Sequence, residues 1–412
     1  MFPKPENENM SSHLKLLSRR VFSIAVWVTC GIALALYPFR LIRKGLSHRV
    51  FSLWTGTPIL TLPTKARAEC LLGVTAKTLV FTTYYITDDF DYNLSRLSNI
   101  PIIGRFLPLP VFLWACVMMD RMHSFCDRGI LPPSAPFTYD FRELKIYRLL
   151  GIDVFLWAYG ADVRNQLTSH SMGTPNPCTD CTTPGKYCIC DPQKAAENMR
   201  KLSALSRAIF AGMGEMYGYT PGSIDNVFYW PLDLDSERGH RYQPTFPALD
   251  AGRPLRIVHA SNHRMFKGTR FLIEAVEQLK GEGEQVELVL VERVPNTQAL
   301  ELYKSADVIF DQCIMGNHGF FALEAMALGK PVMCFIRHPE QYLLHPEECP
   351  IIRIHVSTLK EDIRAILKRR SELTEIGKRG RRYVETYFSV RAFSQRLNTA
   401  YDHIFQISCN KY

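Results

Sequence analysis

The second half of the chain alternates short apolar runs with segments of helical periodicity. Apolar runs at residues 256–260, 286–292 and 306–312 predict strands. Residues 271–280 space their apolar side chains along one face of a helix, and a second helix ends at Gly329 before a last strand. Strands that alternate with helices predict a parallel, doubly wound α/β sheet, whose ligands bind at the carboxyl ends of the strands.

The first half carries a second, less regular succession of the same kind. Its predicted strands lie within residues 50–63, 78–86, 120–133, 152–164, 206–216 and 225–234, and its predicted helices at 65–73 and 143–151. A stretch rich in proline, glycine and charge at residues 236–254 indicates a linker. The pattern therefore predicts two α/β domains, residues 49–245 and 246–390, with residues 1–48 before them and 391–412 after them.

Residues 21–39 form a run of 19 residues without charge. The run is apolar all round, and its length is near the minimum that crosses a bilayer core of ~30 Å. Basic residues flank it, and residues 1–50 hold +6 of the net charge of +9. We predict a hydrophobic membrane helix that keeps the rest of the chain at the cytoplasmic face. A helix buried against the first domain, or a re-entrant one, is the alternative.

Composition narrows the class of protein. Of 412 residues, 47% are hydrophobic and 22% charged, which is typical of globular domains. No interleaving of basic and aromatic residues continues into the domains, so we expect no nucleic-acid partner.

Four of the twelve cysteines cluster, in a C-x2-C-x6-C-x-C pattern formed by Cys178, Cys181, Cys188 and Cys190. Four thiolates satisfy tetrahedral zinc, so the pattern predicts a structural metal site. A disulfide-bonded loop and a loose thiol-rich loop are the alternatives.

The candidate chemistry lies at the carboxyl edge of the second sheet. Arg264 and Lys267 follow the first strand, and a diphosphate is best held by such cations together with free N–H groups at a helix start. Those N–H groups belong to the segment that opens the next helix, formed by Asn317, His318, Gly319 and Phe320. Glu324 lies more than one turn inside that helix, where its carboxylate suits the hydroxyls of a ribose. The alternatives are an exposed basic turn and a solvated helix acid.

This region resembles the donor-binding domain of family 4 glycosyltransferases. The resemblance rests on residues 263–279, 305–312, 319–332 and 377–405. It implies the GT-B fold, two Rossmann-like domains facing a cleft, with a C-terminal helix that returns to the first domain. It further implies that Arg264 and Lys267 bind the donor diphosphate, that Glu324 binds the ribose, and that Gly56, in the turn after the first strand, contacts the donor.

The chain departs from the family pattern at two positions. Gly316 stands where family members commonly carry a glutamate that touches the donor sugar, and Tyr159 stands where many carry a histidine over that sugar. Tyr159, Asp162 and Arg164 are candidate residues of the active cleft, with a plain loop cap as the alternative.

The sequence and the resemblance together predict a membrane-associated transferase of polysaccharide or glycoconjugate biosynthesis. It would move a sugar from a UDP-, GDP- or ADP-sugar to a lipid-linked or growing glycan acceptor. The resemblance implies retention of configuration and no catalytic metal or other cofactor. The alternative is a non-catalytic nucleotide-sugar-binding scaffold in a glycan-assembly complex; an epimerase or phosphorylase of the same fold has no supporting residue.

Overall fold

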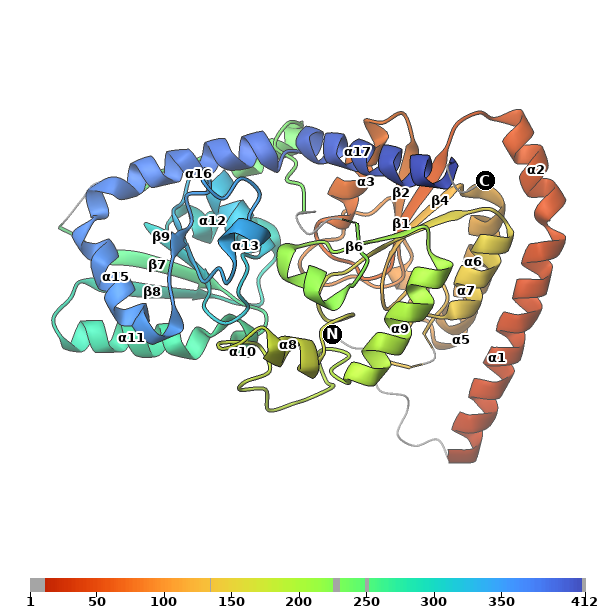
Figure 1. Cartoon of the computed structure of the whole chain (residues 1–412), viewed down its shortest axis with the longest axis horizontal. Coiled ribbons are helices and arrows are strands. Elements are labelled where there is room, and N and C mark those ends of the chain that lie inside the picture. The colour runs from red at the N-terminus through yellow and green to blue at the C-terminus, as the bar shows by residue number, and fades with distance from the viewer. Residues whose placement is uncertain (1–11, 134, 225–229, 249–251, 410–412) are drawn as a thin grey trace. The chain divides into compact units, whose positions relative to one another are not determined.

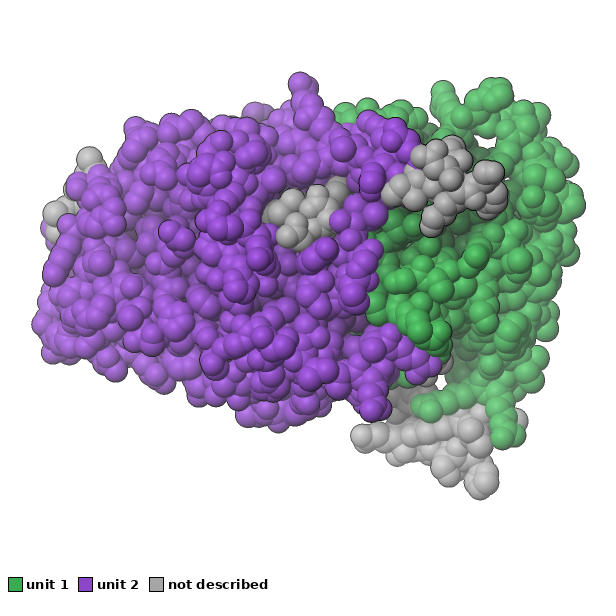
Figure 2. Space-filling view, in the orientation of Figure 1, with its two compact units in different colours: residues 1–157, 198–209 green, residues 158–197, 210–412 purple. Residues whose placement is uncertain are grey.

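The computed structural model describes residues 12–133, 135–224, 230–248 and 252–409. Two compact units divide the chain: unit 1 comprises residues 1–157 and 198–209, and unit 2 comprises residues 158–197 and 210–412 (Figure 2). Residues 1–11 of the predicted membrane segment and residues 225–229 of the predicted strand at 225–234 lie outside the described part of the chain.

The first sheet has six strands in the order β3-β2-β1-β4-β5-β6 (Figure 1). Their bounds are β1 (Phe51–Thr55), β2 (Thr75–Val80), β3 (Tyr92–Asn93), β4 (Arg121–Phe125), β5 (Asp153–Trp157) and β6 (Ala208–Phe210). From β3 to β5 in this order, each strand pairs in parallel with its neighbour. Strands β1, β4 and β5 are buried along most of their length because helices cover both faces of the sheet.

The prediction for residues 78–86 was partly wrong, because β2 begins earlier and ends at Val80. The residues that follow are β-branched and aromatic, but β-propensity alone does not extend a strand beyond its paired neighbours.

The helices of unit 1 fall into two groups. The first covers the sheet and comprises α3 (Leu62–Cys70) and α7 (Phe141–Leu149). Helix α9 (Pro192–Leu205) spans the boundary between the two units. The second comprises α1 (Ser12–Ala35), α2 (Tyr37–Leu46), α4 (Ser95–Ser98), α5 (Pro101–Phe106) and α6 (Pro108–Met118), and Figure 1 shows α1 running alongside α6 and α7. Helices α4 to α6 were not predicted from the sequence.

The apolar segment near the N-terminus is a bent pair of helices rather than one straight helix over residues 21–39. Helix α1 ends at Ala35, and α2 leaves it at an angle of 45°. Pro38 explains the break, since proline lacks an N–H and disfavours helical geometry in the residue before it. Within the described residues, only Pro101–Met118, and this bent pair taken as one, are long and apolar enough to cross a membrane.

The second sheet, in unit 2, has five parallel strands in the order β11-β10-β9-β7-β8. Their bounds are β7 (Leu255–Ala260), β8 (Val286–Val291), β9 (Val308–Gln312), β10 (Val332–Cys334) and β11 (Ile352–Arg353). The predicted helices are α11 (Thr269–Gly281) and α13 (Phe320–Ala327), separated by α12 (Asn296–Lys304).

The core of unit 2 joins the sheet to α11 and to α15 (Leu359–Lys368). The apolar face predicted for residues 271–280 is the one that α11 buries, through Leu272, Val276 and Leu279. The chain ends with α16 (Leu373–Tyr387) and α17 (Val390–Cys409). The prediction that the last helix packs on the first domain stays a prediction.

Candidate functional site

Two segments at the carboxyl edge of the second sheet meet at one carboxylate. The short helix α10 (Arg264–Lys267) follows β7, and Gly319 precedes α13 after β9. Lys267 Nζ lies 2.5 Å from Asp311 Oδ1, and the Gly319 N–H donates to Asp311 Oδ2 at 2.5 Å. The structure therefore brings together two predicted residues, Lys267 and Gly319, around Asp311, which the sequence analysis missed.

Asp311 is completely buried at the end of β9. Burial by itself raises the pKa of this carboxyl group, but the Lys267 charge and the Gly319 N–H outweigh burial and hold the pKa below its usual value. The carboxylate is thus ionised at neutral pH and positions the cation and the helix start beside each other. A polar residue at the carboxyl end of an apolar run was the signal in the sequence.

Gly319 provides space for a neighbouring side chain rather than an unusual backbone angle. A Cβ at this position would lie 2.9 Å from Lys267 Nζ and 3.4 Å from Asp311 Oδ1. The lysine ammonium can approach the start of α13 this closely only because position 319 has no side chain.

Asn317 and His318, just before Gly319, are buried. The Asn317 Oδ1 accepts from the His318 N–H at 2.9 Å, while its Nδ2 has no hydrogen-bond partner among the described residues. A buried amide donor without a partner is costly, and it suits a site that takes a ligand rich in acceptors. Burial lowers the pKa of His318 to about 4, so its imidazole is neutral at pH 7.

Arg264 lies apart from the Asp311 cluster. Its guanidinium pairs with Glu292 at 2.6 and 2.9 Å, and its side chain is 54% exposed. An exposed ion pair of this kind contributes little to stability, so Arg264 remains available to a ligand at small cost.

Glu324 is a buried acid, so the alternative of a solvated helix acid is wrong. Its Oε1 accepts from Asn296 Nδ2 at 2.9 Å and from the Tyr242 hydroxyl at 3.3 Å. Burial raises the pKa of Glu324 to about 7 despite these two donors. Phe320, one turn earlier in α13, packs edge-on against Trp230 at 6.0 Å between ring centroids.

The loop after β5 contains a loop cap formed by Asp162 and a buried ion pair formed by Arg164. Asp162 Oδ1 accepts from the backbone N–H groups of Tyr159 (3.0 Å) and Gly160 (2.9 Å), which is the loop-cap arrangement. Arg164, also buried, donates from Nη2 to Glu215 Oε1 at 2.7 Å. Burial raises the pKa of Glu215, and the Arg164 charge opposes that rise. No motif around Glu215 predicts this partner from the sequence.

Arg337 packs over Gly316, the position where the resemblance places a glutamate. A Cβ on Gly316 would lie 3.0 Å from Arg337 Nε, and the glycine has φ +88°, which strains other residues. The guanidinium donates to the carbonyls of Met172 (3.1 Å) and Pro175 (2.6 Å). A cation thus lies beside position 316, where the resemblance implies an acid.

The four-cysteine segment packs on the loop after β5 and on α10. The backbone of Cys190 pairs with Arg164 and Gln166 at 3.1 and 2.9 Å. The ring of Tyr187 lies 5.3 Å from that of His263 and 6.2 Å from that of Phe266. The segment therefore supports two of the parts of unit 2 that carry predicted site residues, the loop after β5 and α10.

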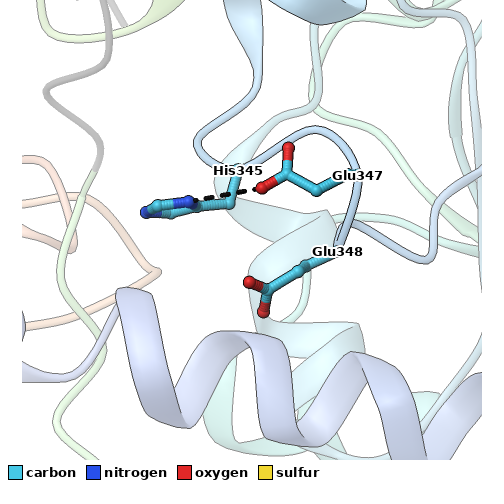
Figure 3. Close-up of side chains that lie close together, drawn as sticks. All are labelled: His345, Glu347 and Glu348. Carbon is cyan, nitrogen blue, oxygen red and sulfur yellow. Dashed lines mark ion pairs between the residues drawn. The ribbon is translucent and has the colours of Figure 1, made fainter.

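The four sulfur atoms do not form a ready metal cage. Among the residues that the structure describes, the single group of three ligand atoms within 4.8 Å of one another belongs to His345, Glu347 and Glu348 (Figure 3). Burial raises the pKa of Cys188 to about 11, so this thiol is neutral unless a metal binds it. Zinc at the cysteines remains a prediction.

His345, Glu347 and Glu348 are all exposed, and the His345 ring stacks on Tyr387 at 4.3 Å. His345 and Tyr387 also line a cavity of about 720 Å³ beside the junction of α16 and α17. None of the predicted donor-binding residues lines this cavity. We assign no metal to these side chains, because exposed acids are well solvated without one.

Gly56 lies in unit 1, directly after β1. Its φ is +111°, and a Cβ there would lie 3.0 Å from the Phe125 ring, so the turn needs glycine for its own geometry.

Unit 1 also contains a buried lysine, Lys65 of α3, whose Nζ lies 4.2 Å from the centroid of the Trp157 ring. Burial lowers the pKa of Lys65 to about 7.

No family model and no curated protein matches the sequence. Among solved structures, sucrose-phosphate synthase from Thermosynechococcus elongatus is 12% identical, with a TM-score of 0.53 over 87% of this chain and 100% of that one. Anabaena HepE in complex with UDP-glucose is also 12% identical, with a TM-score of 0.54 over 86% and 99%. The chain has the two-domain GT-B fold of these proteins.

A third structure extends the comparison. An α-glucosyltransferase in complex with UDP-glucose and DNA is 10% identical, with a TM-score of 0.53 over 87% of this chain and 99% of that one. Identities this low show the fold alone. They confirm the prediction of two parallel-sheet α/β domains, while the role of each site residue rests on the geometry of unit 2.

Proposed function

We propose that the chain is a retaining, family 4-like glycosyltransferase that takes its sugar from a nucleotide diphosphate. The observation that carries the proposal is the convergence of Lys267 and the Gly319 N–H at the start of α13, with the buried Glu324 further along the same helix. A cation and a helix start suit the diphosphate, and a buried carboxylate suits the ribose hydroxyls. HepE and the α-glucosyltransferase, which share the fold, were both solved with UDP-glucose.

In this proposal the protein acts by stabilising the leaving group. Negative charge grows on the diphosphate as the glycosidic bond breaks, and Lys267, Arg264 and the positive end of the α13 dipole meet that charge. Asp311 positions Lys267 and Gly319 without touching the substrate. Protein groups thus supply the positive charge, and no metal takes part in the step.

We further propose that the acceptor is a lipid-linked or growing glycan at the cytoplasmic face of a membrane. The apolar helices of unit 1 support a membrane location, because α1 and α2 expose apolar side chains. Since nucleotide sugars are cytosolic, the same location gives the enzyme both substrates.

The test is a thermal-shift panel of UDP-, GDP- and ADP-glucose, followed by a search for donor hydrolysis and transfer. One nucleotide should raise the melting temperature, and Glu324→Ala should abolish that rise while the unliganded protein still folds. A protein that shifts with none of the three donors would contradict the proposal.

The second candidate function is a nucleotide-sugar-binding scaffold without activity. It is favoured by Gly316, where a relative would carry a sugar-binding glutamate and this chain has Arg337 alongside. A scaffold would show the thermal shift and turn over no donor, even with membrane extracts as the source of acceptor.

A further inference from the structure

Unit 1 carries an apolar face built from two segments far apart in sequence. Helix α1 exposes Ile24 (63%) and Trp27 (61%), α2 exposes Ile42 (58%) and Leu46 (84%), and α5 exposes Ile102 (77%). The two segments touch, since the Phe22 and Phe106 rings lie 5.9 Å apart. We call the exposed apolar side chains of α1, α2 and α5 the apolar face.

Helix α1 is apolar on both sides, which is unusual for a helix at the surface of a soluble domain. Its other side packs on unit 1 through a buried stripe at helical spacing, formed by Val26, Thr29, Cys30 and Ala33. An ordinary surface helix would expose polar residues opposite such a stripe. The exposed side therefore fits an apolar surrounding.

The bent pair is fastened to unit 1 along its length. Arg40 of α2 is buried and donates to the carbonyls of Leu150 (3.1 Å) and Met119. Arg43 forms two hydrogen bonds with Asp120, at 2.9 and 2.5 Å. Near the middle of α1, Arg142 donates to the Ser23 hydroxyl at 3.1 Å.

These contacts decide how the helices meet a membrane. For the bent pair to cross a bilayer as one span, it would have to leave α6 and α7, and the buried Arg40 of α2 would lose its partners at high cost. With the contacts in place, the bent pair lies flat on unit 1 and presents only its outer side. The geometry is that of an interfacial helix.

Charge distinguishes a lipid surface from a protein partner. The chain has no Asp or Glu between Glu8 and Glu69, nor between Asp91 and Asp120, so both segments of the apolar face lack acids. Exposed bases border them instead: Arg19, Arg20, Lys44, Arg49 and Arg96. Basic residues around an apolar face complement anionic lipid head groups.

We propose that the apolar face docks unit 1 flat on an anionic bilayer, with α1 in the plane of the interface rather than across it. The inference rests on the proposed membrane location and replaces the predicted spanning helix with an in-plane one. It adds α5, a segment that the sequence analysis left unassigned, to the docking surface.

The test uses full-length protein and vesicles of phosphatidylcholine with or without phosphatidylglycerol. Wild-type protein should co-sediment, more strongly when phosphatidylglycerol is present. Ile24→Glu combined with Ile102→Glu should lower the partition coefficient by about tenfold or more. Leu167→Glu, at an equally exposed leucine of unit 2, is the matched control and should bind as wild type does.

Two further measurements separate flat docking from its rivals. A protease added outside the vesicles should reach both an N-terminal tag and the body of the protein; a tag protected inside would mean a spanning helix and overturn the proposal. Unchanged binding by the double variant would overturn it as well. If the wild type is a dimer that the double variant disrupts, and neither binds vesicles, the face is an interface between copies.

Donor binding reports separately on the proposed function. The double variant should keep the thermal shift that the wild type shows with whichever of UDP-, GDP- and ADP-glucose it binds. Vesicle binding without a thermal shift by any of the nucleotide sugars would contradict the proposed function and still support docking on the bilayer. A thermal shift without vesicle binding would contradict the docking and still support the proposed function.

Discussion

Asp311 links the two groups that we assign to the diphosphate, so substitutions at the site must be made in pairs. Lys267→Ala alone leaves a fully buried carboxylate without its cation and should cost about 3 kcal/mol of stability. A loss of turnover in that variant would then mix catalysis with folding.

Lys267→Ala combined with Asp311→Asn should recover most of that stability, because the uncompensated charge is gone. It should not recover turnover, since the charge on the leaving diphosphate still lacks its lysine. Urea unfolding and donor turnover of both single variants and the double variant make the comparison. Recovery of turnover together with stability would mean that Lys267 is structural.

The raised pKa of Glu324, about 7, predicts a pH dependence of donor binding. The ionised carboxylate accepts hydrogen bonds from ribose hydroxyls better than the neutral acid does, so UDP-glucose affinity should rise as the pH rises through 7. The diphosphate of UDP-glucose has no proton to lose in this range. Glu324→Gln should bind more weakly, with an affinity that does not change between pH 6 and 8. Isothermal titration at both pH values checks this.

The same group makes the opposite contribution to the stability of the unliganded protein. Its pKa is raised on folding, so the stabilisation is full below the unfolded pKa and is lost as the pH rises through about 7. Melting temperatures of wild type and Glu324→Gln should therefore draw apart in favour of the variant between about pH 4.5 and 7, and the difference should level off above that range. Parallel melting curves across this range would contradict the buried, partly protonated state.

A candidate site residue could be predicted from the sequence where its position relative to a strand or helix start indicates its role. Lys267, Gly319 and Glu324 each stand at a fixed place relative to a strand or a helix start, and that order is visible in the sequence. Asp311 lies 44 positions from its partner Lys267, and Arg337 lies 165 positions from Met172. Such pairs depend on tertiary proximity, which one sequence without known contacts does not supply.

At the scale of elements, hydrophobic periodicity predicted where helices form better than it predicted whether their apolar faces pack on protein or on lipid. Helix α11 matches residues 271–280 because its buried stripe is continuous. The apolar run at residues 21–39 was interpreted as one membrane helix because hydropathy does not register Pro38 or the buried stripe from Val26 to Ala33. Whether an apolar helix packs on protein or on lipid is decided by its partners.

At the same scale, we predict that the four-cysteine segment binds zinc. Protein purified without added metal should hold about one zinc per chain by elemental analysis. Cys181→Ser should lose the metal and lower the melting temperature, because the segment supports the loop that carries Arg164. Cys70→Ser, at an exposed cysteine of unit 1, is the control and should keep the zinc. Four thiols that all titrate with a disulfide reagent, with no metal present, would leave only the loose loop.

For the whole molecule, the alternation of strands and helices was enough to predict two α/β domains. The boundaries follow less directly, since the chain crosses between the units more than once: residues 158–197 belong to unit 2 and residues 198–209 to unit 1. A linear reading assigns one continuous stretch to each domain. The linker composition at residues 236–254 gave no sign of these crossings.

The N-terminal helices make the last prediction one about the integrity of unit 1. The sequence alone predicts that a chain beginning near Ser47 is soluble and still binds donor. In the structure, that deletion removes Arg40 and Arg43 and leaves Asp120 without either cation. Burial raises the pKa of Asp120, and hydrogen bonds from Arg43 and the Phe51 N–H more than reverse the rise, so the carboxylate is ionised and needs them.

Deleting residues 1–46 should therefore destabilise unit 1 by about 3 kcal/mol or more, beyond any loss of membrane binding. Arg43→Ala in the full-length chain should reproduce part of the loss while keeping α1 and α2. Unit 2 holds its own sheet and core, so limited proteolysis should leave it protected in both variants while unit 1 is digested. If the shortened chain melts and resists protease as the full chain does, the two helices are an appendage, and lipid would be the main contact they need.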